Sequence, residues 1–221
     1  MTHAGPEIGV ASTKAFTTQL VSLALLLCSI GKLQNTIDMK QEKEIVDGLK
    51  KLPGLINKTL LQETQIKKLA NRFIDKNSAL FLGRGTMHAI AMEGALKLKE
   101  ISYIHAEAYP AGELKHGPIA LIDINMPVIA IAPNDDLLEK LKSNLQEVKS
   151  RGSQMIVFED ENSQVQSMDA LEVISVTSNL GRITAPIIFT IPLQLLSYYV
   201  ALEKGTNVDK PRNLAKSVTV E

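Results

Sequence analysis

The chain has 221 residues, of which 45% are hydrophobic and 22% are charged, and its 24 basic residues balance its 24 acidic ones. This composition can build a buried core, and the zero net charge argues against a nucleic-acid partner or a polybasic membrane anchor. The one cysteine, Cys28, cannot form an internal disulfide, so we expect a cytoplasmic protein. Because Cys28 stands in an apolar run, we expect a buried and inert thiol.

The first third of the chain predicts three helices and no strand. Apolar periodicity predicts a long helix over 11–33 and charge-rich amphipathic helices over 40–57 and 61–75. We expect Lys51-Leu52-Pro53-Gly54 to interrupt the second of these helices near its end. Helices without strands of their own indicate the end of another domain or a helical extension.

From residue 78 onward, short apolar runs alternate with segments of helical character. The expected strands are 78–83, 127–132, 155–158 and 171–176, and the expected helices are 87–101, 135–150 and 186–203. This alternation predicts an α/β fold with a doubly wound parallel sheet and right-handed crossovers. Ligands in such sheets bind beyond the carboxyl ends of the strands, which points to the turns after Gly83 and Ala132.

Three further segments have a simple interpretation. Ile183 to Leu202 carries no charge and is long enough to cross a bilayer, but two prolines interrupt it, and we expect a buried core or interface helix and no membrane span. Residues 101–118 are dense in Gly, Pro, His and Glu and predict an irregular loop, the kind of segment in which chemistry concentrates. Residues 206–221 predict a polar surface tail.

The turn Gly83-Arg84-Gly85-Thr86 has two equally supported interpretations. Two glycines after a strand and before a helix let the backbone approach an anion. The same glycines also fit an ordinary strand-to-helix turn, because His88 stands where a dinucleotide-binding motif has its third glycine. His88 itself is expected to be a cap or a surface residue.

The helix that follows this turn carries Glu93, Lys97 and Glu100 on one face, at spacing i, i+4, i+7. On an exposed face they would make only weak ion pairs. In a cleft, a carboxylate could move a proton between neighbouring carbons, and a lysine beside it would tune its pKa. The spacing alone favours the exposed face. His116, beside Gly117, also has two interpretations: a turn could present it to a substrate, or its ring could simply form hydrogen bonds with neighbouring residues.

Three stretches of the chain carry a resemblance to a known family. They are Glu7 to Thr17, Glu93 to Pro118 and Pro211 to Glu221. Together they strongly resemble the C-terminal, sugar isomerase (SIS) portion of the glutamine–fructose-6-phosphate amidotransferase family, which has two flavodoxin-like SIS domains. The resemblance implies three parts: a helical end of a first SIS domain (1–75), a complete second SIS domain (76–205) and a tail with an active-site lysine (206–221).

The resemblance also implies roles for particular residues. Glu100 would be the base that moves a proton between C1 and C2 of the sugar, with Lys97 and Glu93 as the neighbours that hold and tune it. His116 would open the sugar ring across a homodimer interface, and Lys216 would form an imine with the open-chain ketose. Three residues would touch the sugar: Val10, Ser12 and Ala215.

The implied reaction converts fructose 6-phosphate to glucosamine 6-phosphate, with ammonia from glutamine in the full enzyme, and it needs no cofactor and no metal. The sequence contains neither the family's glutaminase domain nor its Ser-x-Ser-Gly-x-Thr phosphate loop. An alternative is therefore a non-catalytic fragment that binds sugar phosphate or dimerises. A free-standing isomerase of another phosphosugar is a third interpretation, against which the ending Asn213-Leu214-Ala215-Lys216 argues.

Overall fold

The computed structural model describes residues 1–165, 171–177 and 180–217. Its helices are α1 (Lys14–Leu33), α2 (Met39–Leu60), α3 (Glu63–Ala70), α4 (Thr86–Ser102), α5 (Leu138–Lys149) and α6 (Thr184–Glu203). Its strands are β1 (Ser78–Gly83), β2 (His105–Pro110), β3 (Val128–Ala132), β4 (Met155–Asp160) and β5 (Leu171–Thr177). Short 3-10 helices are η1 (Asn71–Phe73), η2 (Ala111–His116) and η3 (Pro118–Leu121).

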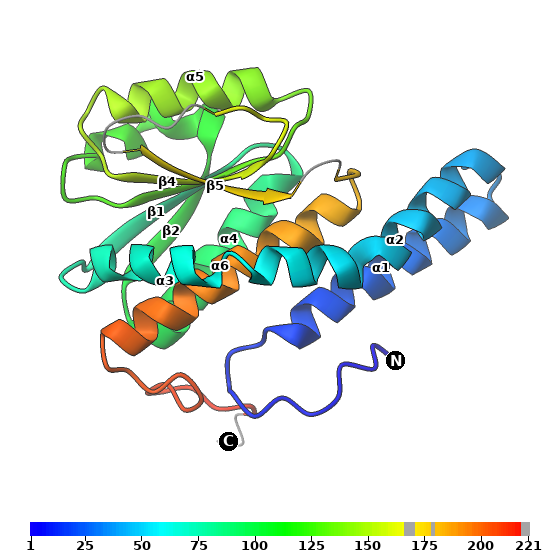
Figure 1. Ribbon diagram of the computed structural model, residues 1–221, viewed down its shortest axis with the longest axis horizontal. Helices are drawn as coiled ribbons and strands as arrows, with labels where there is room; N and C mark the ends of the chain where they lie inside the picture. Colours follow the sequence, from blue (N-terminus) through cyan, green and yellow to red (C-terminus); the bar gives the residue numbers. More distant parts are fainter. Residues whose placement is uncertain (166–170, 178–179, 218–221) are drawn as a thin grey trace.

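The five strands form one parallel sheet in the order β2-β1-β3-β4-β5. Helices α4 and α6 cover one face of the sheet and α5 covers the other (Figure 1). This strand order is that of flavodoxin-like doubly wound sheets. The predicted fold class is therefore confirmed. The four expected strands lie within a residue or two of β1, β3, β4 and β5. Strands β1, β3 and β4 are largely apolar runs buried on both faces of the sheet, whereas β5 lies at the edge and is buried only in part.

Strand β2 was not predicted, and the expectation of an irregular segment over 101–118 is wrong for its central part. Residues His105 to Pro110 pair in parallel with β1, from Ser78↔His105 to Gly83↔Pro110. The strand lies at the sheet edge, where polar and apolar residues alternate and only Ala106 is fully buried. A short polar segment of this kind becomes a strand only through its pairing with β1.

Helix α2 runs without a break through Pro53, so the predicted interruption is wrong. Asp38 caps its N-terminus in a reciprocal capping box with Gln41. A proline inside a helix removes a backbone hydrogen bond and costs roughly 3 kcal/mol. Pro53 is exposed, whereas Leu52 is buried, and the next apolar residues pack against the same core as α6. This tertiary packing holds the helix together.

Two described helices, α1 and α6, are long and apolar enough to cross a membrane by length and composition alone. Most of α6 is buried between α2, α3, α4 and the sheet, which confirms the prediction of a core helix. Helix α1 contacts the rest of the protein mainly through α2 and α6 and leaves several leucines exposed. Cys28, on its inner side, is buried and free, as predicted.

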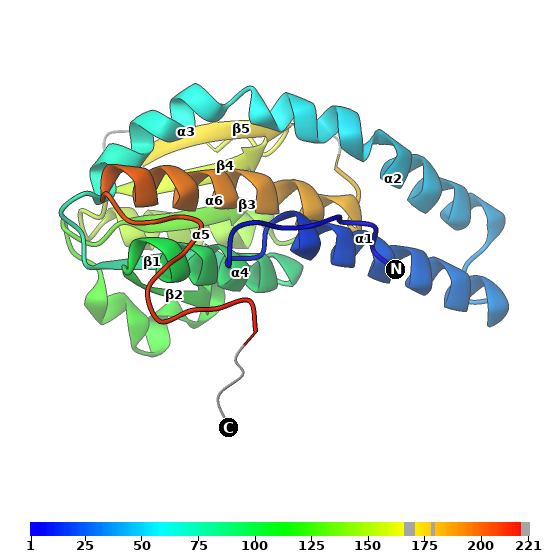
Figure 2. The same cartoon turned by 90° about the horizontal axis from the view of Figure 1, so that it is seen from below.

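The segment after α6 folds back beside the N-terminal segment (Figure 2). The backbone N–H of Val10 donates to the carbonyl of Asp209 at 3.0 Å. Further along, the backbone N–H of Arg212 donates to the hydroxyl of Tyr103 at 2.8 Å, and its guanidinium lies 4.1 Å from the centre of that ring. The predicted tail lies on the surface, but these contacts hold its described part in place. Residues 218–221 of that tail lie outside the described residues.

Candidate active site

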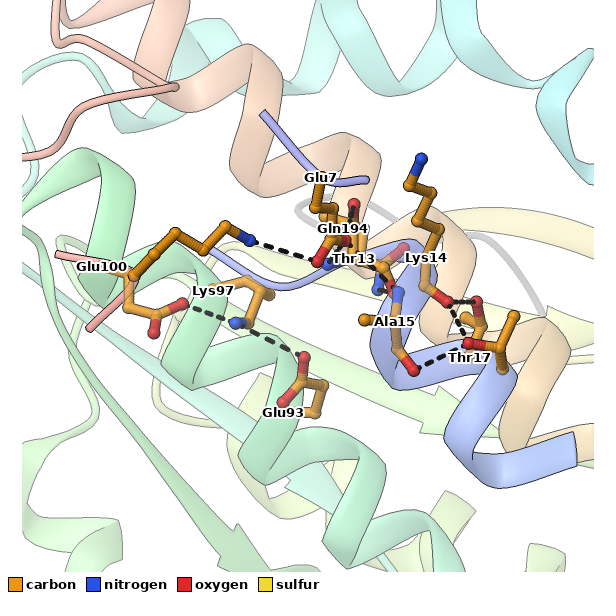
Figure 3. Close-up of polar contacts among 11 residues, drawn as sticks. Glu7, Thr13, Lys14, Ala15, Thr17, Glu93, Lys97, Glu100 and Gln194 are labelled. Carbon is orange, nitrogen blue, oxygen red and sulfur yellow. Dashed lines mark hydrogen bonds and ion pairs between the residues drawn. The ribbon is translucent and has the colours of Figure 1, made fainter. Parts of the chain in front are cut away.

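Glu93, Lys97 and Glu100 lie on one face of α4 and contact one another (Figure 3); Glu93 and Lys97 are buried and Glu100 is half-buried. The Lys97 ammonium lies 2.5 Å from Glu100 Oε2 and 3.6 Å from Glu93 Oε1. The side chain of Lys97 is 4% exposed, that of Glu93 is 9% exposed and that of Glu100 is 22% exposed. The prediction of an exposed helix face, which spacing alone favoured, is therefore wrong. Two carboxylates instead share one lysine where water is largely excluded.

Burial sets the protonation of Glu93. It raises the pKa of the Glu93 carboxyl to about 7, with a smaller contribution in the same direction from the Glu100 carboxylate, while the Lys97 ammonium opposes the rise. Apart from the ion pairs with Lys97, Glu93 Oε1 and Glu100 Oε2 are buried and have no hydrogen-bond partner among the described residues. The Glu93 carboxyl can therefore hold or release a proton near neutral pH.

This raised pKa predicts a pH-dependent stability. Between the ordinary value of 4.5 and the folded value of about 7, the folded protein keeps a proton on Glu93 that the unfolded chain has lost. The free energy of unfolding should therefore fall by about 1–3 kcal/mol as the pH rises from about 4.5 to 7. Glu93→Gln, which cannot titrate, should lack this part of the decline. Urea unfolding of both proteins near the two ends of that range measures it, and parallel pH profiles would contradict the assignment.

No role for Glu7 was predicted from the sequence. This side chain lies across the N-terminus of α1, where Oε1 accepts the backbone N–H groups of Thr13 at 2.7 Å and Ala15 at 3.3 Å. Its other oxygen, Oε2, accepts a hydrogen bond from Lys216 Nζ at 3.3 Å. The helix N-terminus and Lys216 favour the anionic carboxylate, so the pKa of Glu7 lies below its usual value although burial opposes the shift.

A cavity of about 330 Å³ lies between Lys97 of the α4 cluster and Glu7. Its walls come from the N-terminal segment, α4, α6 and the segment after α6, and they include Glu7, Lys97 and Tyr198. This volume lies at the lower end of the range for small-molecule pockets, about 300–1,000 Å³. Val10 and Ser12 are half-buried in the loop that forms one wall, and Ala215 is exposed directly before Lys216.

His116 does not join this cluster within one chain. It ends η2, which follows the carboxyl end of β2, and its exposed ring contacts Glu113 Oε2 through Nδ1 at 2.8 Å. Helix α4 starts at the carboxyl edge of the sheet and ends at Ser102, beside the amino end of β2. A helix of its length spans about 25 Å. Glu100 and His116 therefore lie at opposite ends of the sheet.

The turn after β1 is shaped by packing. A Cβ atom at Gly83 would lie 2.2 Å from the carbonyl oxygen of Met87, and Gly85 has a φ of +53°. Both positions therefore require glycine to connect β1 to α4, whether or not an anion binds there. His88 is half-buried, and its Nδ1 has no hydrogen-bond partner among the described residues. The carboxylate–lysine cluster lies on α4, away from the turns where the sheet topology alone placed a ligand.

Two other features do not involve the predicted site residues. A cavity of about 810 Å³ lies between α1, α2 and the start of α6, lined by apolar side chains such as Leu27 and Ile30 and by charged ones such as Glu44 and Asp47. These carboxylates are exposed and do not form a buried carboxylate–lysine cluster like that of α4, so the smaller cavity is the better candidate for chemistry. Within the described ranges, no group of three or more His, Cys, Asp or Glu side chains could hold a metal ion.

The fold and the buried cluster on α4 define a flavodoxin-like α/β protein with a candidate site for proton transfer. The family profile described as "SIS domain" matches residues 72–204. The chain belongs to this SIS domain family.

Curated relatives are similar to the chain over its whole length. The glutamine–fructose-6-phosphate aminotransferase [isomerizing] of Pseudomonas putida is 60% identical over 221 residues, which is all of this chain and 36% of that protein. The protein of the same name from Haemophilus influenzae is 58% identical over the same shares. The chain thus spans just over a third of the length of these relatives.

Solved structures agree with the fold. The C-terminal domain of glucosamine-fructose-6-phosphate aminotransferase from Francisella tularensis has a TM-score of 0.92 and 53% identity, covering 95% of this chain and 59% of that one. A putative phosphosugar isomerase from Silicibacter pomeroyi has a TM-score of 0.72 and 27% identity, covering 94% and 58% of the two chains.

Proposed function

We propose that this chain is the sugar-isomerising portion of a glutamine–fructose-6-phosphate aminotransferase. The observation that carries the proposal is the buried Glu93–Lys97–Glu100 cluster, whose Lys97 lines a cavity that the segment leading to Lys216 also lines, through Val208 and Asp209. The names of relatives at 57–60% identity support the substrate, fructose 6-phosphate, and the product, glucosamine 6-phosphate. A cytoplasmic location belongs to the same proposal, because the names of these relatives describe an enzyme of sugar phosphate metabolism.

The proposed mechanism starts with the open-chain ketose. The Lys216 amine adds to C2, a C–N bond forms, and the carbonyl oxygen leaves as water, which gives a protonated imine. Ammonia then replaces lysine at C2 and releases the Lys216 amine. The new imine acidifies the C1 protons, so that the Glu100 carboxylate can remove one and return it to C2. O1 loses its proton as C1 becomes an aldehyde, and the amino group stays on C2.

The neighbours of Glu100 have a supporting part in this mechanism. Lys97 contacts both carboxylates and itself lines the cavity, so it holds Glu100 in place and compensates its charge. Glu93 has a pKa of about 7, so near neutral pH it adds less than a full negative charge beside Glu100. Val208 and Asp209 of the described tail segment form part of the cavity wall, which limits the access of water during the reaction.

The location of His116 supports a dimeric site as part of the proposal. Ring opening needs an acid and base near the ring oxygen, and His116 lies at the far end of the sheet from Glu100 in its own chain. A second copy could present its own His116 to this cavity. The proposed active unit is therefore a homodimer in which each site draws on both subunits.

Mixing inactive variants tests the shared site. His116→Ala and Lys216→Ala, each made in the chain together with the sequence encoded directly upstream, should separately lose formation of glucosamine 6-phosphate. After joint unfolding and refolding, mixed dimers should regain a measurable part of the activity, because one of their two sites has both residues. Refolding each variant alone is the control, and it should restore nothing. Absence of any gain on mixing, with mixed dimers verified by mass, would show that His116 does not act across the interface.

A non-catalytic role for this chain alone is the second candidate, favoured by the absence of a Ser-x-Ser-Gly-x-Thr phosphate loop from its sequence. Calorimetry with fructose 6-phosphate separates the possibilities. Heat of binding without turnover in the isolated chain, together with turnover in the longer protein, fits a binding portion that another segment completes. Absence of heat at saturating sugar would remove the binding role of the isolated chain.

A further inference from the structure

We infer that Glu7 is a positioning residue that aims the Lys216 amine at the sugar. The inference rests on the proposed function, because it assigns a partner to the lysine of that mechanism. It is carried by the way in which one carboxylate joins the start of α1 to the C-terminal segment.

The two carboxylate oxygens of Glu7 accept hydrogen bonds from different partners. Oε1 accepts the backbone N–H groups of Thr13 and Ala15 and the hydroxyl of Thr13, at 2.7, 3.3 and 3.2 Å, and so holds the carboxylate against the N-terminus of α1. Thr13, the N-cap residue of α1, makes no cap hydrogen bond with its own side chain. Glu7 therefore fills the capping position from six residues upstream, which leaves Oε2 directed at Lys216 Nζ.

The segment that carries Lys216 is fixed at two earlier points. Asp209 accepts a backbone hydrogen bond from Val10, and Arg212 is held by the hydroxyl and the ring of Tyr103. Three residues lie between Arg212 and Lys216, enough chain for the lysine side chain to take many directions. The contact with Glu7 selects one of these directions, beside the cavity that Lys97 also lines.

Stability of the fold does not account for this pair. The side chain of Lys216 is 45% exposed, and ion pairs with an exposed partner add little to the free energy of unfolding. The pair does match the charge needed during imine formation. An ammonium before the step and a protonated imine after it both carry one positive charge, and water is the group that leaves. The Glu7 carboxylate therefore pairs with one positive charge at the Lys216 nitrogen both before and after imine formation.

The test combines Glu7→Gln with Lys216→Ala in the longer protein. Glutamine keeps an oxygen that can accept the α1 N–H groups but removes the charge opposite Lys216. We expect kcat for glucosamine 6-phosphate formation to fall about 10–100-fold, as misplacement of a reacting group does, with little change in KM or in thermal midpoint. Glu42→Gln is the matched control, because Glu42 also pairs with a lysine, Lys32, at 2.7 Å, but at the far end of α1.

The double variant decides whether Glu7 acts through Lys216. If it does, Glu7→Gln should cause no further loss once Lys216 is alanine, because coupled residues are not additive. An equal further loss in the double variant, or an unchanged kcat in Glu7→Gln alone, would overturn the inference. If Lys216→Ala itself left the rate unchanged, the proposed mechanism would fail instead, so the two failures are distinguishable.

Discussion

Replacing Lys216 by alanine is expected to lower the formation of glucosamine 6-phosphate by about 1,000-fold or more, which corresponds to ~4 kcal/mol of activation free energy. The expectation follows from the covalent role proposed for this amine, since alanine cannot form the imine that activates C2. Steady-state rates with fructose 6-phosphate and glutamine, in the chain extended by its upstream sequence, measure the effect. The binding of fructose 6-phosphate should change far less than the rate.

Lys210→Ala is the matched control for this variant. Lys210 lies on the same C-terminal segment and is exposed, and it is held there through its backbone N–H, which donates to Asn207. Its removal changes the charge of the segment by the same amount without touching the amine that contacts Glu7. We expect activity close to that of the unsubstituted protein. A similar loss in both variants would show that the charge of the segment matters and that the Lys216 amine does not react.

Replacing Glu100 by glutamine is expected to lower the rate about 10²- to 10⁴-fold, the usual contribution of a positioned general base. Glutamine has nearly the same shape and can still contact Lys97, but it cannot accept a proton from C1. Glu100 is 22% exposed while Glu93 is 9% exposed, so Glu100 is the more accessible of the two carboxylates. Exchange of the C1 proton with deuterated solvent reports this step separately from imine formation.

The comparison with Glu93→Gln assigns the base. If Glu100 moves the proton, Glu100→Gln should abolish C1 exchange, whereas Glu93→Gln should retain most of it and change mainly its pH dependence. An exposed carboxylate such as Glu139, whose side chain is 82% exposed, provides the control for loss of a negative charge. Retention of exchange in Glu100→Gln together with its loss in Glu93→Gln would exchange the two roles.

The sequence predicts the central part of the fold well. Strands β1, β3 and β4 are largely apolar runs, which burial on both faces of a parallel sheet demands, and β5 keeps enough apolar residues to be predicted although it lies at the edge. Strand β2 escaped prediction because it lies at the edge and alternates polar and apolar residues, so its pairing with β1 decides its conformation. The break predicted at Pro53 failed for a related reason: packing of Leu52 and its apolar neighbours against the α6 layer outweighs the local cost of the proline.

The candidate site could be predicted only in part. Spacing placed Glu93, Lys97 and Glu100 on one face of a helix, but it did not show that this face is buried, which depends on α6 and on the N-terminal segment. The contact of Glu7 with Lys216 could not be predicted from the sequence. Its partner, Lys216, lies 209 residues away in sequence, and local periodicity carries no information about such a contact. The same limit applies to His116, whose distance from Glu100 follows from the sheet topology.

The most direct measurement of the central claim is chemical trapping of the imine. The extended protein is incubated with fructose 6-phosphate and a borohydride reductant, which converts a C2 imine to a stable secondary amine, and the modified peptide is located by mass spectrometry. The account predicts a sugar phosphate adduct on Lys216 that is absent from Lys216→Ala and weaker in Glu7→Gln. An adduct on Lys97, or no adduct under conditions in which glucosamine 6-phosphate forms, would contradict it.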